Sequence, residues 1–480
     1  MLNHLFAAIV TCAHASSAVP AVPHHQVSCA ALPMQAGQLD VRLPSSDETS
    51  PSSDDDKIES APAKKIKSGK KRTKDQRRSA EEDGWGAGWK QRPSIRFGSL
   101  FRLDLDGMFQ EDAHASYSGA ADLDAFELRR NRIGLQGSVF KHLDFEIERE
   151  ITGKEVDPSK PPKSPWNDVF VNVGFVKNAQ VQVGKFKIPF GLDELTSIRN
   201  NDFVYRSLGA AYLAPARDVG AMVHGRFFRH GLNYWAGVFL HDGEHARSAK
   251  IRGGDETIAA RVTGRPFRPL GLDSLEIGTA VALSSLSDDW FQPNGLRGKT
   301  VVSDDTFFHA VYVKGQRRRW ETDVDWTAGP AAVRAEYTWV GDERLQQGLG
   351  DQDLPAARAR SWYLSGAWVL TGGSKKRPLR PDRPLLKGGA GAVELVGRYE
   401  RLWFDSVGGA GSDPAYRNPR AENILMSGDR VLTVGVNWIV NRWIKLQVNA
   451  VRERIEDAER SPVSNGAAFW SRVFRVQFAL

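Results

Sequence analysis

The feature that most constrains this chain is a period-two alternation of apolar and polar residues, which begins after Trp85 and recurs up to the last residue. In residues 143–148, for example, Leu, Phe and Ile alternate with Asp, Glu and Glu, and residues 333–339 and 474–480 alternate in the same way. This period is typical of β-strands with one apolar and one polar face. No apolar stretch reaches the roughly 18 residues of a spanning helix. We therefore expect an all-β chain.

The connections between the alternating runs differ strongly in length. Short turns are expected near residues 141, 177–178, 229–231, 266–271, 328–330 and 441–442. Long polar loops are expected near residues 107–123, 152–166, 189–216, 242–255, 286–316, 342–357, 405–427 and 456–466. Short inner turns that alternate with long outer loops are the pattern of a transmembrane β-barrel. The pattern gives sixteen strands if residues 306–314 belong to the fifth loop and residues 372–390 form a long inner turn.

Alternation alone does not separate a membrane barrel from a soluble β-sandwich, because the strands of both have one apolar and one polar face. Strand runs of about ten residues, the contrast between turns and loops, and aromatic residues near the expected strand ends all favour the barrel. These aromatic residues are Trp320, Trp326, Trp339, Trp438, Trp443 and Trp470. The predicted fold is a transmembrane antiparallel β-barrel of about 16 strands.

Composition divides the chain into three parts. Residues 1–30 contain a short apolar core and an Ala-His-Ala site, which predict a signal peptide, although a positively charged start is absent. Residues 31–90 predict a disordered charged linker, and residues 91–480 the barrel domain. Both cysteines, Cys12 and Cys29, precede the barrel. The net charge of +7 arises from 65 basic and 58 acidic residues that are closely mixed, so no nucleic-acid partner is expected.

Five motifs follow one another along the barrel region. They are residues 126–137 (FELRRNRIGLQG), 183–197 (VGKFKIPFGLDELTS), 213–225 (LAPARDVGAMVHG), 395–401 (LVGRYER) and 435–441 (GVNWIVN). Over about residues 94–480, this order resembles the phosphate-selective porin (O and P) family of Gram-negative bacteria. The first motif is similar to the family's arginine-bearing second strand, and the next two to the entry into and the return from its constriction loop. Leu480 departs from the family, which prefers a terminal aromatic residue.

The resemblance implies a sixteen-stranded, trimeric porin whose third loop folds into the lumen and whose arginines form a ladder for anions. A narrow pore strips water from an anion, so selectivity requires fixed positive charge, and the guanidinium group offers a planar fork to phosphate oxygens. The candidate anion-binding residues are Arg129, Arg130, Arg132, Lys185, Lys187, Arg199, Arg206 and Arg217.

Alternation cannot place all of these side chains in the lumen. The apolar phase switches between Leu128 and Ile133, so either a β-bulge lies there or one arginine faces lipid near the rim. Each arginine is as readily expected to pair with a carboxylate as to contact an ion. The carboxylates close in sequence are Glu127, Asp193 and Asp218. A second basic group would attract anions to the pore mouth or contact lipopolysaccharide. This group consists of Arg297, Lys299, Lys314, Arg317, Arg318 and Arg319.

The sequence thus predicts an anion-selective outer-membrane porin, with phosphate as the anion that the resemblance implies. Its expected partners are small anions, outer-membrane lipid, lipopolysaccharide and two further copies of itself in a homotrimer. One alternative is a general, weakly selective porin, and less favoured ones are an outer-membrane β-barrel enzyme and a soluble carbohydrate-binding β-protein. His224, His230 and His241 accompany no nucleophile motif or metal-ligand spacing, so no catalytic residue, metal or cofactor is expected.

Overall fold

The computed structural model describes residues 85–89, 92–116, 124–152, 164–244, 256–288, 293–371, 373–375, 378–406 and 424–480. The signal peptide expected for residues 1–30 and nearly all of the linker expected up to residue 90 lie outside this part of the chain, and they stay predictions. Among the described residues, no helix has the length and apolar character needed to cross a membrane.

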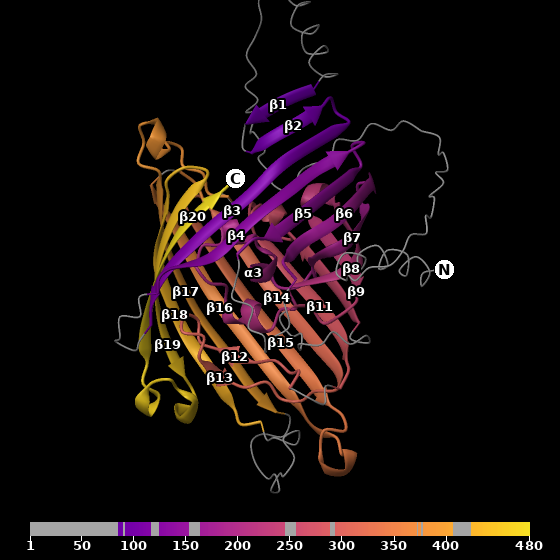
Figure 1. Ribbon diagram of the computed structural model, residues 1–480, viewed down its shortest axis with the longest axis vertical. Helices are drawn as coiled ribbons and strands as arrows, with labels where there is room; N and C mark the ends of the chain where they lie inside the picture. Colours follow the sequence, from indigo (N-terminus) through magenta and orange to yellow (C-terminus); the bar gives the residue numbers. More distant parts are fainter. Residues whose placement is uncertain are drawn as a thin grey trace, which may run out of the picture. The chain divides into compact units, whose positions relative to one another are not determined.

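One closed antiparallel barrel accounts for most of the strands (Figure 1). Nine strands from β3 to β11 and seven from β14 to β20 each pair with the next, and β20 pairs with β3 to complete the ring. In the first half they are β3 (Phe101–Ala115), β4 (Asp124–Val139), β5 (Leu143–Glu150), β6 (Trp166–Val176), β7 (Ala179–Lys187), β8 (Arg217–Phe227), β9 (Leu232–Phe239), β10 (Thr257–Gly264) and β11 (Glu276–Leu286). In the second half they are β14 (Gly315–Ala328), β15 (Ala331–Arg344), β16 (Leu354–Thr371), β17 (Ala392–Ser406), β18 (Ser427–Ile439), β19 (Ile444–Ile455) and β20 (Phe469–Ala479). The predicted barrel and its sixteen strands are confirmed.

Long and short connections alternate around the ring as predicted, and both conditions attached to the strand count hold. Residues 306–314 belong to the fifth loop, where β12 (Gly298–Lys299) and β13 (Thr306–Phe308) form a small sheet of their own. Between β16 and β17, which end and begin at Thr371 and Ala392, the described residues contain the short helix η5 (Leu385–Lys387) and no strand. An even number of strands follows because neither segment adds a strand to the ring.

The beginning of the β structure differs from the prediction in two ways. A hairpin of β1 (Trp85–Trp89) and β2 (Pro93–Phe97) pairs with the start of β3, so β structure begins before residue 91. The β1 sequence, WGAGW, has glycines where the other strands carry polar residues, so it lacks the apolar and polar alternation that identified those strands. The first loop is also shorter than expected, because β3 continues to Ala115 and its buried Gln110 hydrogen-bonds to Gln477 of β20.

Each barrel strand presents one face to the lumen and the other to the outside. On β16, Leu364 and Trp368 each expose 54% of their surface, whereas Tyr363 and Ser365 on the opposite face are buried. Trp320 and Trp470, predicted to lie near strand ends, are likewise 44% and 50% exposed on the outer face. Apolar side chains thus face outwards and polar ones face inwards, which is the arrangement of a barrel in lipid rather than of a soluble sandwich.

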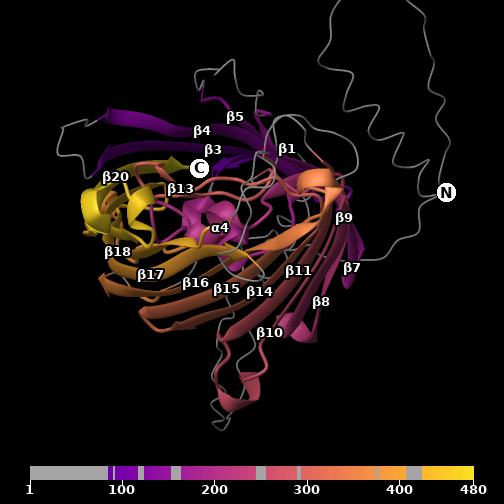
Figure 2. The same ribbon diagram turned by 90° about the horizontal axis from the view of Figure 1, so that it is seen from below.

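Two long loops fold into the barrel (Figure 2). Loop 3, residues 188–216, carries α3 (Leu192–Leu195), η1 (Ile198–Asn200) and α4 (Leu208–Tyr212); loop 5, residues 287–314, carries β12 and β13. Leu208 and Leu213 of loop 3 and Phe308 of loop 5 belong to one apolar cluster with the wall residue Phe404. Phe308 stacks on Phe404 with ring centroids 4.1 Å apart. The largest apolar cluster among the described residues therefore lies inside the lumen, between loops and wall.

Candidate pore constriction and anion site

Loop 3 has a defined conformation that begins directly after β7. Gly191 has a φ of 82° and leads into α3, and Ser207 caps α4 by accepting a hydrogen bond from the amide of Ala210. The carboxylate of Asp193 accepts a hydrogen bond from the Ser207 amide (2.7 Å), which joins the two ends of the loop. These bonds fix the loop as a compact unit inside the lumen.

The barrel wall holds loop 3 chiefly through hydrogen bonds from wall side chains to the backbone carbonyl oxygens of the loop. Arg475 of β20 donates to the carbonyl of Val204 (2.6 Å), and Lys445 of β19 to that of Arg199 (2.9 Å). Arg319 of β14 donates to the carbonyl of Leu213 (2.9 Å). A loop that carries few hydrogen bonds of its own would leave its carbonyls unsatisfied in the lumen, so these cations replace the missing donors.

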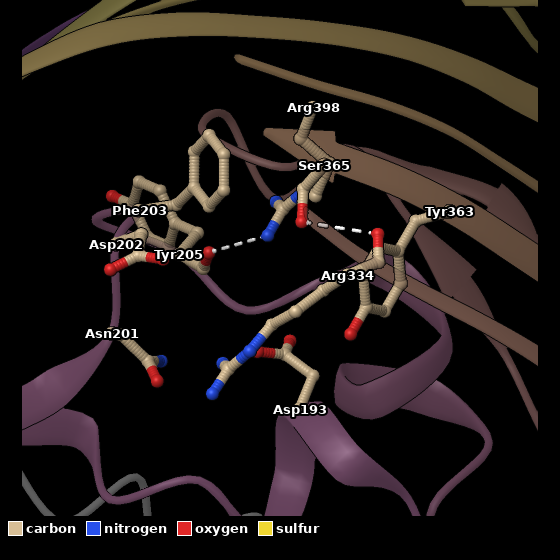
Figure 3. Close-up of a pocket in the computed structure, with 9 residues that line it drawn as sticks. All are labelled: Asp193, Asn201, Asp202, Phe203, Tyr205, Arg334, Tyr363, Ser365 and Arg398. Atoms are coloured by element: carbon tan, nitrogen blue, oxygen red, sulfur yellow. Dashed lines mark hydrogen bonds between the residues drawn. The ribbon is translucent and has the colours of Figure 1, made fainter. Parts of the chain in front are cut away.

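A small pocket lies between the middle of loop 3 and β15 to β17 (Figure 3). Arg398 of β17 donates to the carbonyl of Tyr205 (3.2 Å), and its guanidinium carbon lies 4.6 Å from the centre of the Phe203 ring. Arg334 of β15 pairs with Asp325 at 3.1 Å. The cations of this pocket thus hold the loop and the wall in place.

A β-bulge places three candidate arginines of β4 in the lumen. Arg130 lies opposite Gln110 while the next residue of β3 lies opposite Leu128, so Arg129 is the extra residue of the bulge. The Arg129 guanidinium lies 5.6 Å from the ring centre of Tyr205 in loop 3, and Arg130 donates to the side-chain oxygen of Gln110 (3.0 Å). Of the two arrangements that the phase switch allowed, the bulge is the one observed. Burial raises the pKa of Tyr205, so this phenol stays neutral beside Arg129.

Seven of the eight candidate residues pair with a carboxylate. The pairs are Arg129 with Glu127 (3.5 Å), Arg132 with Glu148 (3.0 Å) and Glu150 (2.8 Å), Lys185 with Glu244 (2.5 Å), Lys187 with Glu194 (3.5 Å), Arg199 with Asp106 (2.5 Å), Arg206 with Glu194 (3.2 Å) and Arg217 with Asp168 (2.6 Å). Lys187, Arg199 and Arg206 belong to or adjoin loop 3.

Lys185 lies opposite Val169 of β6 and opposite Val219 of β8. Val169 is on the same face of β6 as Val171, which is 45% exposed. The register thus places Lys185 on the outward phase of β7, and its ammonium group pairs with Glu244 of the segment after β9.

Arg130 is the exception among the eight candidates. No carboxylate of the described residues pairs with Arg130, and its guanidinium donates a hydrogen bond to the neutral Gln110 side chain. Arg475, Arg129, Arg132 and Arg206 all lie close enough to repel it electrostatically. We call these five residues, Arg129, Arg130, Arg132, Arg206 and Arg475, the lumen arginine cluster. A partly buried positive charge among like charges is favourable only with a counter-anion nearby.

An acidic group lies near this cluster. Asp106, Glu146 and Glu148 each place a carboxylate oxygen within 4.8 Å of the others. Arg132 and Arg199 neutralise part of this charge through Glu148 and Asp106. Positive and negative groups thus line the same part of the lumen, and their balance determines which ions pass.

Of the second basic group, Arg317, Arg318 and Arg319 lie on β14 and are divided between its two faces, whereas Arg297, Lys299 and Lys314 lie in loop 5. The expected role at the pore mouth is wrong for Arg317 and Arg319. Arg317 and Arg319 point into the lumen, where they are buried and share the carboxylate of Asp242 (2.5 Å to each). Burial alone would raise the pKa of Asp242, but Arg319 and Arg317 outweigh it and hold this pKa below its ordinary value. Arg318 points outwards and pairs with Glu343 (2.9 Å).

Several residues that build the site were not identified from the sequence. Arg398, Lys445 and Arg475 bind the carbonyls of loop 3, yet each is an isolated cation on the polar phase of a late strand. Their phase could have indicated that they face the lumen. Their partners could not be inferred, because the loop that they hold lies about 190–270 residues earlier in the chain.

Comparisons with known proteins agree with this architecture. The sequence pattern of the phosphate-selective porin O and P family matches residues 104–479. No curated protein sequence matches significantly. The outer membrane channel DcaP of Acinetobacter baumannii is 11% identical with a TM-score of 0.50, over 82% of this chain and 100% of that one. The trimer form of OmpT from Vibrio cholerae is 12% identical with a TM-score of 0.50, over 79% and 100%. An anion-selective porin from Comamonas acidovorans is 14% identical with a TM-score of 0.49, over 79% and 100%.

A closed barrel with an apolar outer face, a charged lumen and an inward-folded third loop defines an outer-membrane porin. Its fold is that of a channel rather than an enzyme. His224 and His241 hydrogen-bond to Asn172 and Asp218 in the wall, at 2.9 and 3.0 Å. Because the family pattern covers most of its length, the chain belongs to the phosphate-selective porin O and P family. The family predicted from the five motifs and the outer-membrane location are thereby confirmed.

Proposed function

We propose that this porin is an anion-selective diffusion channel and that the lumen arginine cluster binds phosphate-like oxyanions during passage. The observation that carries the proposal is Arg130, a lumen guanidinium without a carboxylate partner among the described residues and with four arginines around it. An oxyanion beside Arg130 would relieve this repulsion and accept charge-assisted hydrogen bonds in a planar, two-pronged geometry.

The other candidate residues have a supporting role in this proposal. Arg132, Arg199 and Arg217 are paired with wall carboxylates, so they set the local potential and shape of the lumen more than they bind ions directly. An anion that entered the cluster would compete with these carboxylates for guanidinium groups. Such competition favours a site that holds the anion weakly enough to release it, as conduction requires.

The proposal is tested by the reversal potential of the purified protein in a planar bilayer under a potassium chloride gradient, followed by phosphate titration at fixed chloride. Arg130→Gln should reduce anion selectivity and weaken the block of chloride current by phosphate about tenfold or more, because a charge-assisted hydrogen bond contributes about 1.5–3 kcal/mol. Arg268→Gln is the matched control. Arg268 is half-exposed in the turn after β10, so this substitution removes the same charge at a site away from the lumen.

Each outcome separates the alternatives. Anion selectivity with phosphate block that Arg130→Gln weakens supports the proposal. A weakly selective current without block would favour the general porin, which the acidic group of Asp106, Glu146 and Glu148 supports. Cation selectivity in the wild-type protein would refute the role of the lumen arginine cluster.

We also propose that the channel is a homotrimer, as the family resemblance implies. Glu111 of β3 lies opposite Val476, whose neighbours Arg475 and Gln477 are buried on the lumen face, so Glu111 lies on the outer face. A carboxylate that faces lipid is unfavourable, and a subunit contact would remove it from lipid. Chemical cross-linking in native outer membranes should yield trimers, and a monomer under all cross-linking conditions would contradict the proposal.

A further inference from the structure

The outer surface of β17 to β20 changes character along the strands. Near the short turns the outward side chains are apolar, as with Leu395, Val436 and Val448, which are 44%, 41% and 51% exposed. Near the long loops they are arginines: Arg401 on β17, Arg430 on β18, Arg452 and Arg454 on β19, and Arg472 on β20. We call these five residues the outer arginine patch. Their outward direction follows from alternation, since Glu453 between Arg452 and Arg454 is fully buried.

The strand register brings like charges of this patch side by side. Arg401 lies directly opposite Arg430, and Arg430 directly opposite Arg454, so three arginines form a row across β17, β18 and β19. Like charges in directly opposite positions destabilise a sheet. Glu456 bridges Arg401 and Arg430, at 2.7 Å from each. Asp405, the other outward carboxylate here, pairs with Arg358 and Arg360 on β16.

The rest of the patch has no counter-charge within the described chain. Arg452, Arg454 and Arg472 are exposed and form no ion pair with any residue that the structure describes. Arginines on the lipid-facing side of a membrane barrel are costly unless they reach polar or anionic groups. Trp403, whose ring centre lies 4.5 Å from the Arg401 guanidinium, lies on the same outer face and fits the polar–apolar boundary of a bilayer.

We propose that the outer arginine patch binds the phosphate groups of a phosphorylated glycolipid in the outer leaflet of the outer membrane. The patch lies at the long-loop ends of its strands, the side that faces the cell exterior in this class of barrel. Arginine forks match phosphate oxygens. The apolar side chains below them, among them Val434 and Val448, offer a surface for the acyl chains of the same molecule.

This proposal is independent of ion selection in the lumen, because the patch lies on the opposite face of the barrel wall from the lumen arginine cluster. Removal of the patch should leave the reversal potential unchanged. Failure of one proposal therefore does not affect the other.

The test uses the full-length refolded protein in detergent and lipid A that carries both phosphates, with its dephosphorylated form as the second probe. The variant Arg452→Gln/Arg454→Gln/Arg472→Gln removes the three unpaired charges, and Arg229→Gln/Arg265→Gln/Arg268→Gln removes three arginines from the short turns. The patch variant should bind bisphosphorylated lipid A at least about tenfold more weakly than the wild type, and the turn variant should bind normally. The wild type should bind dephosphorylated lipid A as weakly as the patch variant does.

Two results would overturn the proposal. One is equal binding of both lipid A forms by the wild type, and the other is equal binding of bisphosphorylated lipid A by the wild type and the patch variant. Anomalous migration of unheated samples on gels verifies that each variant is folded. A patch variant that does not fold is replaced by Arg454→Gln alone, which removes one charge from the row of three and should still weaken binding.

Discussion

Arg475 offers the sharpest test of how the lumen is organised, because its side chain joins the barrel seam to loop 3. Its guanidinium forms two bonds of 2.6 Å to the carboxylate of Asp112 on β3 and a third of 2.6 Å to the carbonyl of Val204. Arg475 and Asp112 are 1% and 0% exposed. The pair therefore closes the ring between its last and first strands and anchors the constriction loop at the same point.

The substitution Arg475→Gln should destabilise the barrel by about 3–5 kcal/mol, the usual cost of leaving one member of a buried ion pair without its partner. Asp112→Asn should cost a similar amount for the same reason. The double variant removes both charges and should recover much of the loss, with a coupling energy of about 2–3 kcal/mol. Arg265→Gln breaks the half-exposed pair with Glu276 and should cost less than about 1 kcal/mol.

The measurement is equilibrium unfolding by urea of the protein in lipid vesicles, followed by tryptophan fluorescence and by gel migration without heating. Strict additivity of the two single substitutions would refute the assignment of Arg475 and Asp112 as one buried unit. A small effect of Arg475→Gln, similar to that of Arg265→Gln, would show that water enters the seam and screens the pair.

Two further predictions concern the loops. Arg319 and Arg317 depress the pKa of Asp242, so the stability that this carboxylate contributes should be complete above about pH 3.9 and be lost only in stronger acid. Protection against hydrogen exchange in residues 240–244, which follow β9, should stay constant from pH 7 to pH 4, and loss of protection by pH 4.5 would contradict the ion pair. Phe308→Ala should remove the stacking on Phe404 and destabilise the attachment of loop 5 by about 3 kcal/mol, which limited proteolysis detects as faster cleavage. Phe308→Leu keeps most of the side-chain volume and should be cleaved more slowly than Phe308→Ala. Equal cleavage rates for the two variants would show that the packing of Phe308 does not hold the loop.

Alternation, together with strand runs of about ten residues, the contrast between short turns and long loops and the aromatic residues near strand ends, was sufficient to predict the barrel and its strand number. Every strand that faces lipid on one side and water on the other must alternate, so the signal repeats around the ring and single errors cancel. The phase change between Leu128 and Ile133 predicted either a bulge or an arginine that faces lipid, because a register shift moves side chains to the other face, and the structure shows the bulge. β1 escaped detection since its sequence has no charged residue to mark a polar face.

Of the ion pairs of the site, the one between Arg129 and Glu127 agrees with the carboxylates named from the sequence, but most of the others could not be predicted in the same way. The carboxylates nearest in sequence were the natural partners to expect, yet Arg217 pairs with Asp168 and Arg199 with Asp106, about 50 and 90 residues away. Arg317 was expected next to the end of the fifth loop, near residue 316. In a loop, no alternation defines which side chains face the lumen. Because β14 begins at Gly315, alternation with the outward Trp320 places Arg317 in the lumen instead.

The bulge in β4 changes how much charge one strand can present to passing ions. In a regular strand, side chains on one face are separated by about 7 Å, since only every second residue points that way. The extra residue lets Arg129 and Arg130, which are consecutive, both reach the lumen. A one-residue insertion thus raises the linear charge density of the wall above the limit of a regular strand. In the proposed anion pathway, an ion would then pass from one guanidinium to the next without crossing a full pleat.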